Sequence, residues 1–258
     1  MAELIRASEG KTHWYKKEDG SPFYTIIGTN GKERNVTLRD ARKLKNIVPS
    51  VTTILKESAR PGLNLWIQNQ VLLAALTLPR IDNETEAEWI VRIMDDSKQT
   101  AIKAAERGTQ IHTWIQQGFE GKLTIGDDGY EYYQAAAATL FDSVQEIGVQ
   151  EIAWICESSF ATDRFGGKVD LYSLAPKYII DVKTKDTTLD NVKTWDEHDM
   201  QTAAYRYGLN QPAAKCGILF ISTLDTSAKL VWIEEKKLER GLQLFNALLG
   251  YWYAKTGL

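Results

Sequence analysis

The sequence predicts a mixed α/β fold, with a central mixed β-sheet flanked by helices and a helical N-terminal half. Two observations lead to this prediction. Residues 1–150 contain long segments with apolar side chains at helical spacing, whereas residues 151–258 contain short apolar, β-branched runs of strand length. In the second half three such runs precede a helical segment, and two follow it before a last helix. That order contains a βββ-α-β core, followed by one further strand and a C-terminal helix.

The N-terminal region begins with turns and continues into long helices. The aromatic-rich runs on either side of Asp19-Gly20 predict a hairpin over residues 12–27, and Thr29-Asn30-Gly31 predicts a second turn. Thr37 followed by Asp40 is a helix-capping pattern, so a short helix should begin there. Four longer helical patterns follow, over residues 63–76, 84–94, 98–119 and 129–147.

The second half supplies the strands. Residues 152–160, 168–174 and 178–183 have strand-like patterns, and a turn containing Pro176 should join the last two. The remaining predicted elements are a helix over residues 197–209, strands over 216–222 and 229–233, and a helix over 238–254.

Length and composition fit one soluble domain over residues 1–258. Of the 258 residues 43% are hydrophobic and 25% are charged, no linker or repeat interrupts them, and no apolar run reaches membrane-spanning length. The net charge of −3 argues against a protein that coats nucleic acid through a diffuse basic surface. The N-terminus lacks the profile of a signal peptide, and two distant cysteines, Cys156 and Cys216, indicate a reducing, cytoplasmic compartment.

Two carboxylates and a lysine lie on what should be adjacent strands. The run over residues 178–183 is apolar until Asp181, and Lys183 would project from the same face two residues later. A hairpin would bring Asp170 alongside Asp181. Two converging carboxylates repel unless a cation lies between them, and oxygen ligands suit Mg²⁺ or Mn²⁺. A surface ion pair of little energetic value between Asp181 and Lys183 would give the same pattern.

Two predicted helices carry further candidates. Gln201 and Tyr205 are four residues apart and share a helix face, as do Gly108 and His112. An ordinary amphipathic face would also explain the first pair, and a histidine with a structural role would explain His112.

Four residue pairs, which come from two predicted helices and two predicted strands, together resemble in their order and spacing the motifs of the PD-(D/E)XK nuclease superfamily. The resemblance extends to its RecB-type exonuclease branch, which includes Cas4-like and mitochondrial genome maintenance exonucleases. The matching residues are Gly108 and His112, Gly167 and Asp170, Asp181 and Lys183, and Gln201 and Tyr205. Residues 49–55 also resemble a stretch near the start of viral members, with which a virus-encoded origin is consistent.

The resemblance implies a restriction-endonuclease-like core and a metal-dependent DNA exonuclease that acts in recombination, repair or replication. Its products would carry 5′-phosphate and 3′-hydroxyl ends. The implied ligands of Mg²⁺ or Mn²⁺ are His112, Asp170, Asp181 and the backbone carbonyl of Val182. Lys183 would orient or deprotonate the attacking water, or stabilise the phosphorane. Gln201 and Tyr205 would position the phosphate or the water.

Four further residues are candidates by position. Glu157 lies on the strand before Asp170, where related nucleases often have an acidic residue, but a pair with Arg164 or Lys168 would also explain it. Arg164 and Lys185 flank the site and could contact phosphates, although a solvated loop surface would carry the same charges. Trp195, in the polar loop before the helix over 197–209, could stack on a base, although most aromatic side chains pack in cores.

The chain departs from part of the family in its cysteines. Many Cas4-like members hold an iron–sulfur cluster on four cysteines, and Cys156 with Cys216 cannot supply four thiolates within one chain. We therefore expect no iron–sulfur cluster. The expected partners are DNA, single-stranded or with a free end, and a recombination or replication protein. The alternatives are a structure-specific or restriction-type endonuclease, an inactive nucleic-acid-binding module, and a Mg²⁺-dependent enzyme for a small phosphate ester.

Overall fold

The computed structural model describes residues 13–59, 61–145, 152–175 and 177–258, and the chain divides into two compact units. Among these residues the first unit comprises 59 and 61–110, and the second comprises 13–58 and those from 111 onward. The expectation of one nuclease domain over residues 1–258 stays a prediction. No described helix is both long enough and apolar enough to cross a membrane.

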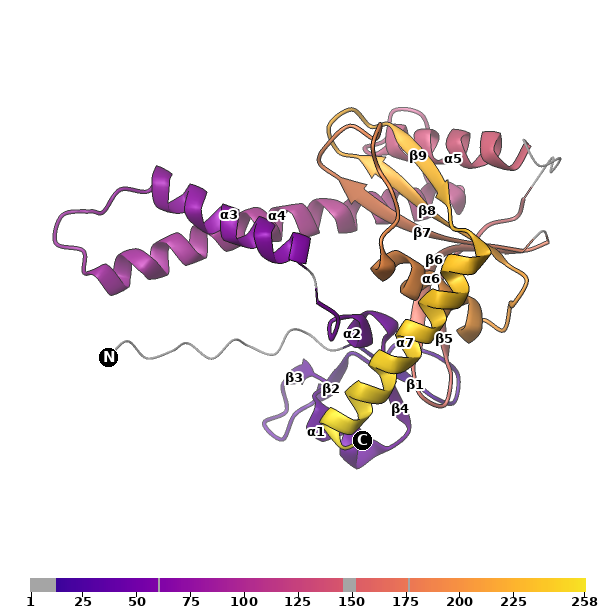
Figure 1. Cartoon of the computed structure of the whole chain (residues 1–258), viewed down its shortest axis with the longest axis horizontal. Coiled ribbons are helices and arrows are strands. Elements are labelled where there is room, and N and C mark those ends of the chain that lie inside the picture. Colours follow the sequence, from indigo (N-terminus) through magenta and orange to yellow (C-terminus); the bar gives the residue numbers. More distant parts are fainter. Residues whose placement is uncertain (1–12, 60, 146–151, 176) are drawn as a thin grey trace. The chain divides into compact units, whose positions relative to one another are not determined.

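The first unit is a pair of helices, α3 (Pro61–Thr77) and the N-terminal part of α4 (Glu86–Phe119), which lie side by side (Figure 1). The prediction of separate helices over 84–94 and 98–119 is wrong, because α4 runs through both. Neither glycine nor proline stands between these segments. The hydroxyl of Ser97 donates to the Met94 carbonyl (2.8 Å), so this polar residue is satisfied within the helix.

The second unit begins with a layer of short elements, called here the N-terminal layer. They are β1 (Trp14–Lys16), β2 (Thr25–Ile27), β3 (Glu33–Asn35), α1 (Leu38–Leu44), β4 (Ile47–Pro49) and α2 (Val51–Leu55). The chain reverses at Asp19-Gly20, where the N–H of Phe23 donates to the Trp14 carbonyl (2.8 Å). The expected hairpin does not lengthen into a ladder, because Pro22 has no N–H to donate, and β1 pairs with β4 instead. Residue 12 lies outside the described residues.

The other local predictions in this layer are confirmed. Thr29-Asn30-Gly31 lies in the turn between the antiparallel strands β2 and β3. Thr37 and Asp40 form the capping box of α1, and Arg34 adds two hydrogen bonds to the Asp40 carboxylate (2.7 and 2.8 Å).

The sheet of the second unit has five strands, in the order β5-β6-β7-β8-β9. They are β5 (Ile155–Ala161), β6 (Gly166–Leu174), β7 (Lys177–Lys185), β8 (Lys215–Ser222) and β9 (Ala228–Trp232). β7 and β8 are parallel and are joined through α6 (Asp196–Gly208), whereas the other neighbours are antiparallel. The predicted mixed sheet flanked by helices is therefore confirmed. Pro176 and residues 146–147 lie outside the described residues.

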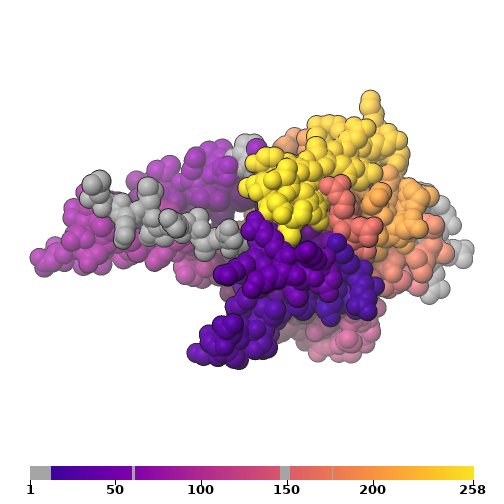
Figure 2. Space-filling view, turned by 90° about the horizontal axis from the view of Figure 1, so that it is seen from below, coloured from indigo at the N-terminus to yellow at the C-terminus, as the bar shows by residue number. Residues whose placement is uncertain are grey.

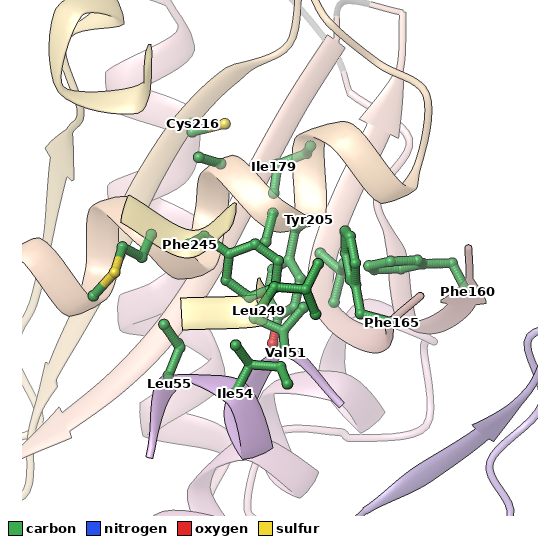
Figure 3. Close-up of a cluster of buried hydrophobic side chains, with 14 of the residues drawn as sticks. Val51, Ile54, Leu55, Phe160, Phe165, Ile179, Tyr205, Cys216, Phe245 and Leu249 are labelled. Atoms are coloured by element: carbon green, nitrogen blue, oxygen red, sulfur yellow. The ribbon is translucent and has the colours of Figure 1, made fainter. Parts of the chain in front are cut away.

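Helices cover both faces of this sheet. On one face α6, α7 (Glu235–Thr256) and the N-terminal layer share a core that includes Ile54, Ile179 and Phe245 (Figure 3). On the other face α5 (Tyr130–Gln145) and the end of α4 form a second core with Ile180. Ile179 and Ile180 thus point to opposite sides of β7, as strand geometry requires. Residues 13–58 and α7 also meet at the surface (Figure 2), where Lys255 pairs with Glu57 (2.8 Å).

The start of α6 is held by a histidine that must be neutral. The backbone N–H of Trp195 donates to Nδ1 of His198 (3.2 Å), so this nitrogen carries no proton. Burial, with the positive charges of Lys183 and Lys185, lowers the pKa of His198 from 6.5 to about 4.

We predict that the contribution of His198 to stability falls as the pH falls from 6.5 towards 4. In this window His198 binds a proton in the unfolded chain but not in the folded one, which lowers the free energy of unfolding by at most about 3 kcal/mol. The raised pKa of Asp181 acts in the opposite direction, so the His198 contribution is the difference between the wild type and a variant that lacks this histidine. Urea unfolding at several pH values measures it. His198→Gln, whose amide can still accept the Trp195 N–H, should flatten the dependence. An equally steep curve for this variant would contradict the assignment.

Candidate active site

The hairpin of β6 and β7 places Asp170 opposite Asp181. Their ladder ends at the pair Leu171 and Ile180, and the next pair in register is Asp170 with Asp181. Here the strands open, because the N–H of Val182 donates to Oδ2 of Asp170 (2.7 Å) rather than to a backbone carbonyl of β6. The register therefore places Asp170 and Asp181 opposite each other on neighbouring strands, and a metal ion shared by the two carboxylates stays a prediction.

Strands β5 and β6 change face beside this opening. Val169 and Leu171 are two residues apart and would share a face in a regular strand, yet they belong to cores on opposite sides of the sheet. The change falls at Asp170 and at Glu157, its neighbour on β5, whose φ of +51° lies in the left-handed region. A non-glycine residue in that conformation costs about 1–3 kcal/mol, and such strain concentrates at functional sites.

Three side chains at this point could share a metal ion. His112 from α4, Glu157 from β5 and Asp170 from β6 each offer a ligand atom, and these atoms lie within 4.8 Å of one another. Nδ1 of His112 lies 3.5 Å from Oδ1 of Asp170. Two carboxylates and an imidazole are a donor set suited to Mn²⁺, and to Mg²⁺ through the oxygens.

Both interpretations of Glu157 are compatible with the structure. Its carboxylate forms an ion pair with Lys168, as the structural interpretation requires, and it also lies in the group with His112 and Asp170. A carboxylate has two oxygens, so one can pair with the ammonium while the other faces the group.

Asp181 is the most deeply buried member of the site, with its side chain 2% exposed. Oδ1 accepts a hydrogen bond from Nε2 of Gln201 (2.8 Å). Nζ of Lys183 lies 2.7 Å from Oδ2 as an ion pair, and no other described residue hydrogen-bonds to this oxygen. A buried carboxylate oxygen with this spare capacity can accept a metal ion, so the residues present fit a divalent cation.

Gln201 and Tyr205 form a buried chain behind Asp181. Nε2 of Gln201 also donates to the hydroxyl of Tyr205 (2.8 Å), and both side chains are at most 5% exposed. Burial raises the pKa of Tyr205 well above 10, so its phenol is neutral. Its ring explains the motif glycine: a Cβ on Gly167 would lie 2.9 Å from Cε1 of Tyr205. The predicted contact of this pair with a phosphate or a water stays a prediction.

Mutual interactions set the charge states in the site. Burial raises the pKa of Asp181 to about 6. Burial also acts to raise the pKa of Asp170, but His112, Lys183 and the Val182 N–H together outweigh it, and the pKa ends below its usual value. Burial acts to lower the pKa values of His112 and Lys183, but the two carboxylates outweigh it and both pKa values are raised. Lys183 is therefore an ammonium at neutral pH.

The other predicted residues lie around this cluster or away from it. Val182 is on β7 between Asp181 and Lys183, and the role of its carbonyl stays a prediction. Lys185 is half-buried at the end of β7. Arg164, in the turn between β5 and β6, stacks on the ring of Tyr253 (5.2 Å) and so has a protein partner. Trp195 is 58% exposed just before α6, with Nζ of Lys193 4.5 Å from its ring centre.

No local pattern in the sequence predicts that tyrosines of the N-terminal layer lie near the site. The hydroxyls of Tyr15 and Tyr24 are 2.9 Å apart. Burial raises the pKa of Tyr15, with smaller contributions from Tyr24 and from the charge of Glu157, so this pair lies near the Glu157 and Lys168 ion pair. More than 100 residues separate the two pairs along the chain, and only the tertiary fold brings them together.

Comparisons with known proteins yield distant structural similarity alone. The chain matches no family model and no curated protein. Solved structures that resemble it include a protein from Eubacterium rectale described as a candidate exonuclease (15% identity, TM-score 0.40, 58% of this chain and 68% of that one). A second is SSO0001, with 13% identity and a TM-score of 0.31 over 72% of this chain and 86% of that one. A third is a phage-related exonuclease from Haemophilus somnus 129PT, with 14% identity and a TM-score of 0.29 over 72% of this chain and 92% of that one. With TM-scores below 0.5, these likenesses carry no argument about function.

We predict that Mn²⁺ stabilises the protein through this cluster. A cation relieves the repulsion between Asp170 and its neighbours, and a hundredfold excess over Kd adds about 2.7 kcal/mol, or roughly 5–10 °C in Tm. Thermal unfolding with Mn²⁺ and with EDTA measures it. Asp170→Asn should remove the shift, whereas Asp190→Asn, at an exposed carboxylate elsewhere, should keep it. An equal shift in both variants would place the ion elsewhere.

Proposed function

We propose that this chain is a metal-dependent DNA nuclease, and more narrowly an exonuclease that leaves 5′-phosphate and 3′-hydroxyl ends. The observation that carries the proposal is the placement of Asp170 opposite Asp181 where β6 and β7 part, with Lys183 2.7 Å from Asp181 and with His112 and Glu157 beside Asp170. An ordinary surface ion pair has no reason to bury its carboxylate to 2% exposure beside a second one. A role in recombination, repair or replication rests on the family resemblance of the motifs.

The metal would be held by His112, Asp170 and Asp181, with Glu157 and the carbonyl of Val182 as further donors. When bound, a divalent cation neutralises charge on the phosphate oxygens and makes a water more acidic. Asp181 is already buried and Asp170 is already held by the Val182 N–H, so both carboxylates have defined positions before a cation binds. Mg²⁺ and Mn²⁺ both suit the carboxylates, and the imidazole favours Mn²⁺.

Lys183 would act as a fixed positive charge. Its raised pKa keeps it protonated in the metal-free protein, so the charge state supports stabilisation of the phosphorane and orientation of the water rather than removal of a proton. The side chain is one-third exposed, so its ammonium can reach a substrate while it pairs with Asp181.

Gln201 would serve the reaction by positioning Asp181. We predict that Gln201→Met, which keeps the size of the side chain but cannot donate to Oδ1, weakens apparent Mn²⁺ affinity about 10- to 100-fold. The KM for DNA should change little. Activity titrations against Mn²⁺ and against DNA separate the two quantities. A raised KM with unchanged Mn²⁺ dependence would instead indicate that Gln201 contacts the phosphate or the water.

The function itself is tested with 5′-labelled, 3′-labelled and circular DNA, single- and double-stranded, with Mg²⁺, Mn²⁺ or EDTA. We expect metal-dependent loss of linear DNA. Lys183→Ala should lower the rate about 100- to 1,000-fold, because a charge aimed at the developing phosphorane is lost. Lys177→Ala, on an exposed lysine at the other end of β7, should cleave at the wild-type rate.

The same digestion distinguishes the alternatives. Rapid cutting of circular DNA would replace the exonuclease with a structure-specific or restriction-type endonuclease. DNA binding without cleavage in any metal would indicate an inactive binding module. Hydrolysis of a small phosphate ester with no action on DNA would overturn the nuclease proposal altogether.

A further inference from the structure

Helix α3 has apolar residues on every side, with four uncharged amide side chains among them, and few of its residues are buried within the described part of the first unit. It has no charged residue over Pro61–Thr77. Among the described residues of the first unit, only Ala74, Ile93 and Ser97 are buried. A helix that is hydrophobic all round is normally buried on every side, and within the described residues of the first unit α4 covers only one side of α3 (Figure 1).

The exposed side of α3 carries a continuous apolar stripe. Its members, the α3 stripe, are Leu65 (59% exposed), Trp66 (37%), Leu72 (60%), Leu73 (53%) and Leu76 (82%). At 3.6 residues per turn they fall within an arc of roughly 120°, on the side of the helix opposite the buried Ala74. Monomeric proteins seldom expose a contiguous apolar patch larger than a few hundred Å². The exposed stripe therefore indicates a surface that binds another molecule.

The spacing of the stripe identifies the partner as a second copy. Leu65 and Trp66 precede Asn69 by four and three residues, and Leu72 and Leu73 follow it by three and four. These four of the five members are symmetric about Asn69, and such a pattern is self-complementary when two helices pack antiparallel about a two-fold axis. The fifth member, Leu76, would lie opposite Gly62 of the other copy. Leu65 would then meet Leu73 of the other copy, Trp66 would meet Leu72, and Asn69 would meet its own equivalent. A single asparagine in an apolar seam is a device that fixes register.

The chemistry of α3 disfavours nucleic acid as the occupant. Binding to phosphates requires lysine or arginine, and the helix carries neither. The area suits a protein partner: the stripe exposes on the order of 500 Å² per copy, close to the ~600 Å² per partner at the lower end of specific interfaces.

We propose that two copies of this protein associate through their α3 stripes, packed antiparallel about a two-fold axis at Asn69. The association is independent of the nuclease chemistry, because the stripe and the metal-binding side chains are different residues.

Sedimentation equilibrium of the full chain over a range of concentrations tests the proposal. We expect the wild type to be dimeric, and Leu72→Glu with Leu73→Glu to raise the dimer dissociation constant at least about a hundredfold, since buried charges oppose the contact. Ile67→Glu is the matched control, because Ile67 is 46% exposed on the other side of the same helix. It should remain dimeric. Circular dichroism checks that all three variants are folded.

A cross-link tests the two-fold axis directly. Asn69→Cys should form a disulfide-linked dimer on mild oxidation, because the two-fold axis brings each copy's cysteine to the other. Gln68→Cys, one residue away on the helix, should not. A monomeric wild type, an unchanged mass for the Leu72 and Leu73 variant, or equal cross-linking at both positions would overturn the proposal.

Discussion

The burial of a carboxylate beside a second carboxylate is the constraint on which the rest of the structure depends. Asp181 is taken out of water in a sheet covered on both faces, and Asp170 stands opposite it. Neither a hydrophobic core nor a hairpin tolerates that arrangement without compensation. The cost of burial is offset by ion pairs and hydrogen bonds. Lys183 and Gln201 interact with Asp181, and His112 and the Val182 N–H interact with Asp170.

These compensating groups come from different layers of the fold. His112 reaches the site from the helix over one face of the sheet, and Gln201 reaches it from the helix over the other. The parallel arrangement of β7 and β8 requires a connection that crosses the sheet, and α6 is that connection. The crossover helix is therefore also the element that orients the deepest carboxylate. The packing of α6 on the sheet therefore also sets the position of Gln201 beside Asp181.

Much of this could be predicted from the sequence where the cause is local. A period of two along β7 is enough to pair Asp181 with Lys183, and a turn before Lys177 is enough to place Asp170 beside Asp181. Helical spacing likewise puts Gln201 and Tyr205 together. What escaped prediction depends on distant contacts: the pairing of β1 with β4, the tyrosines near Glu157, and the amide of Gln201 turned towards Asp181. The continuity of α4 escaped because polar residues alone do not end a helix.

Gly167 illustrates how a residue without a functional group can belong to the candidate site. The Tyr205 ring occupies the volume where any other side chain would begin. A larger residue at this position would displace α6, and with it the amide that holds Asp181. In a survey of substitutions scored only by activity, Gly167 would thus be indistinguishable from a catalytic residue. Gly167 contributes by having no side chain, which leaves room for the Tyr205 ring behind Asp181.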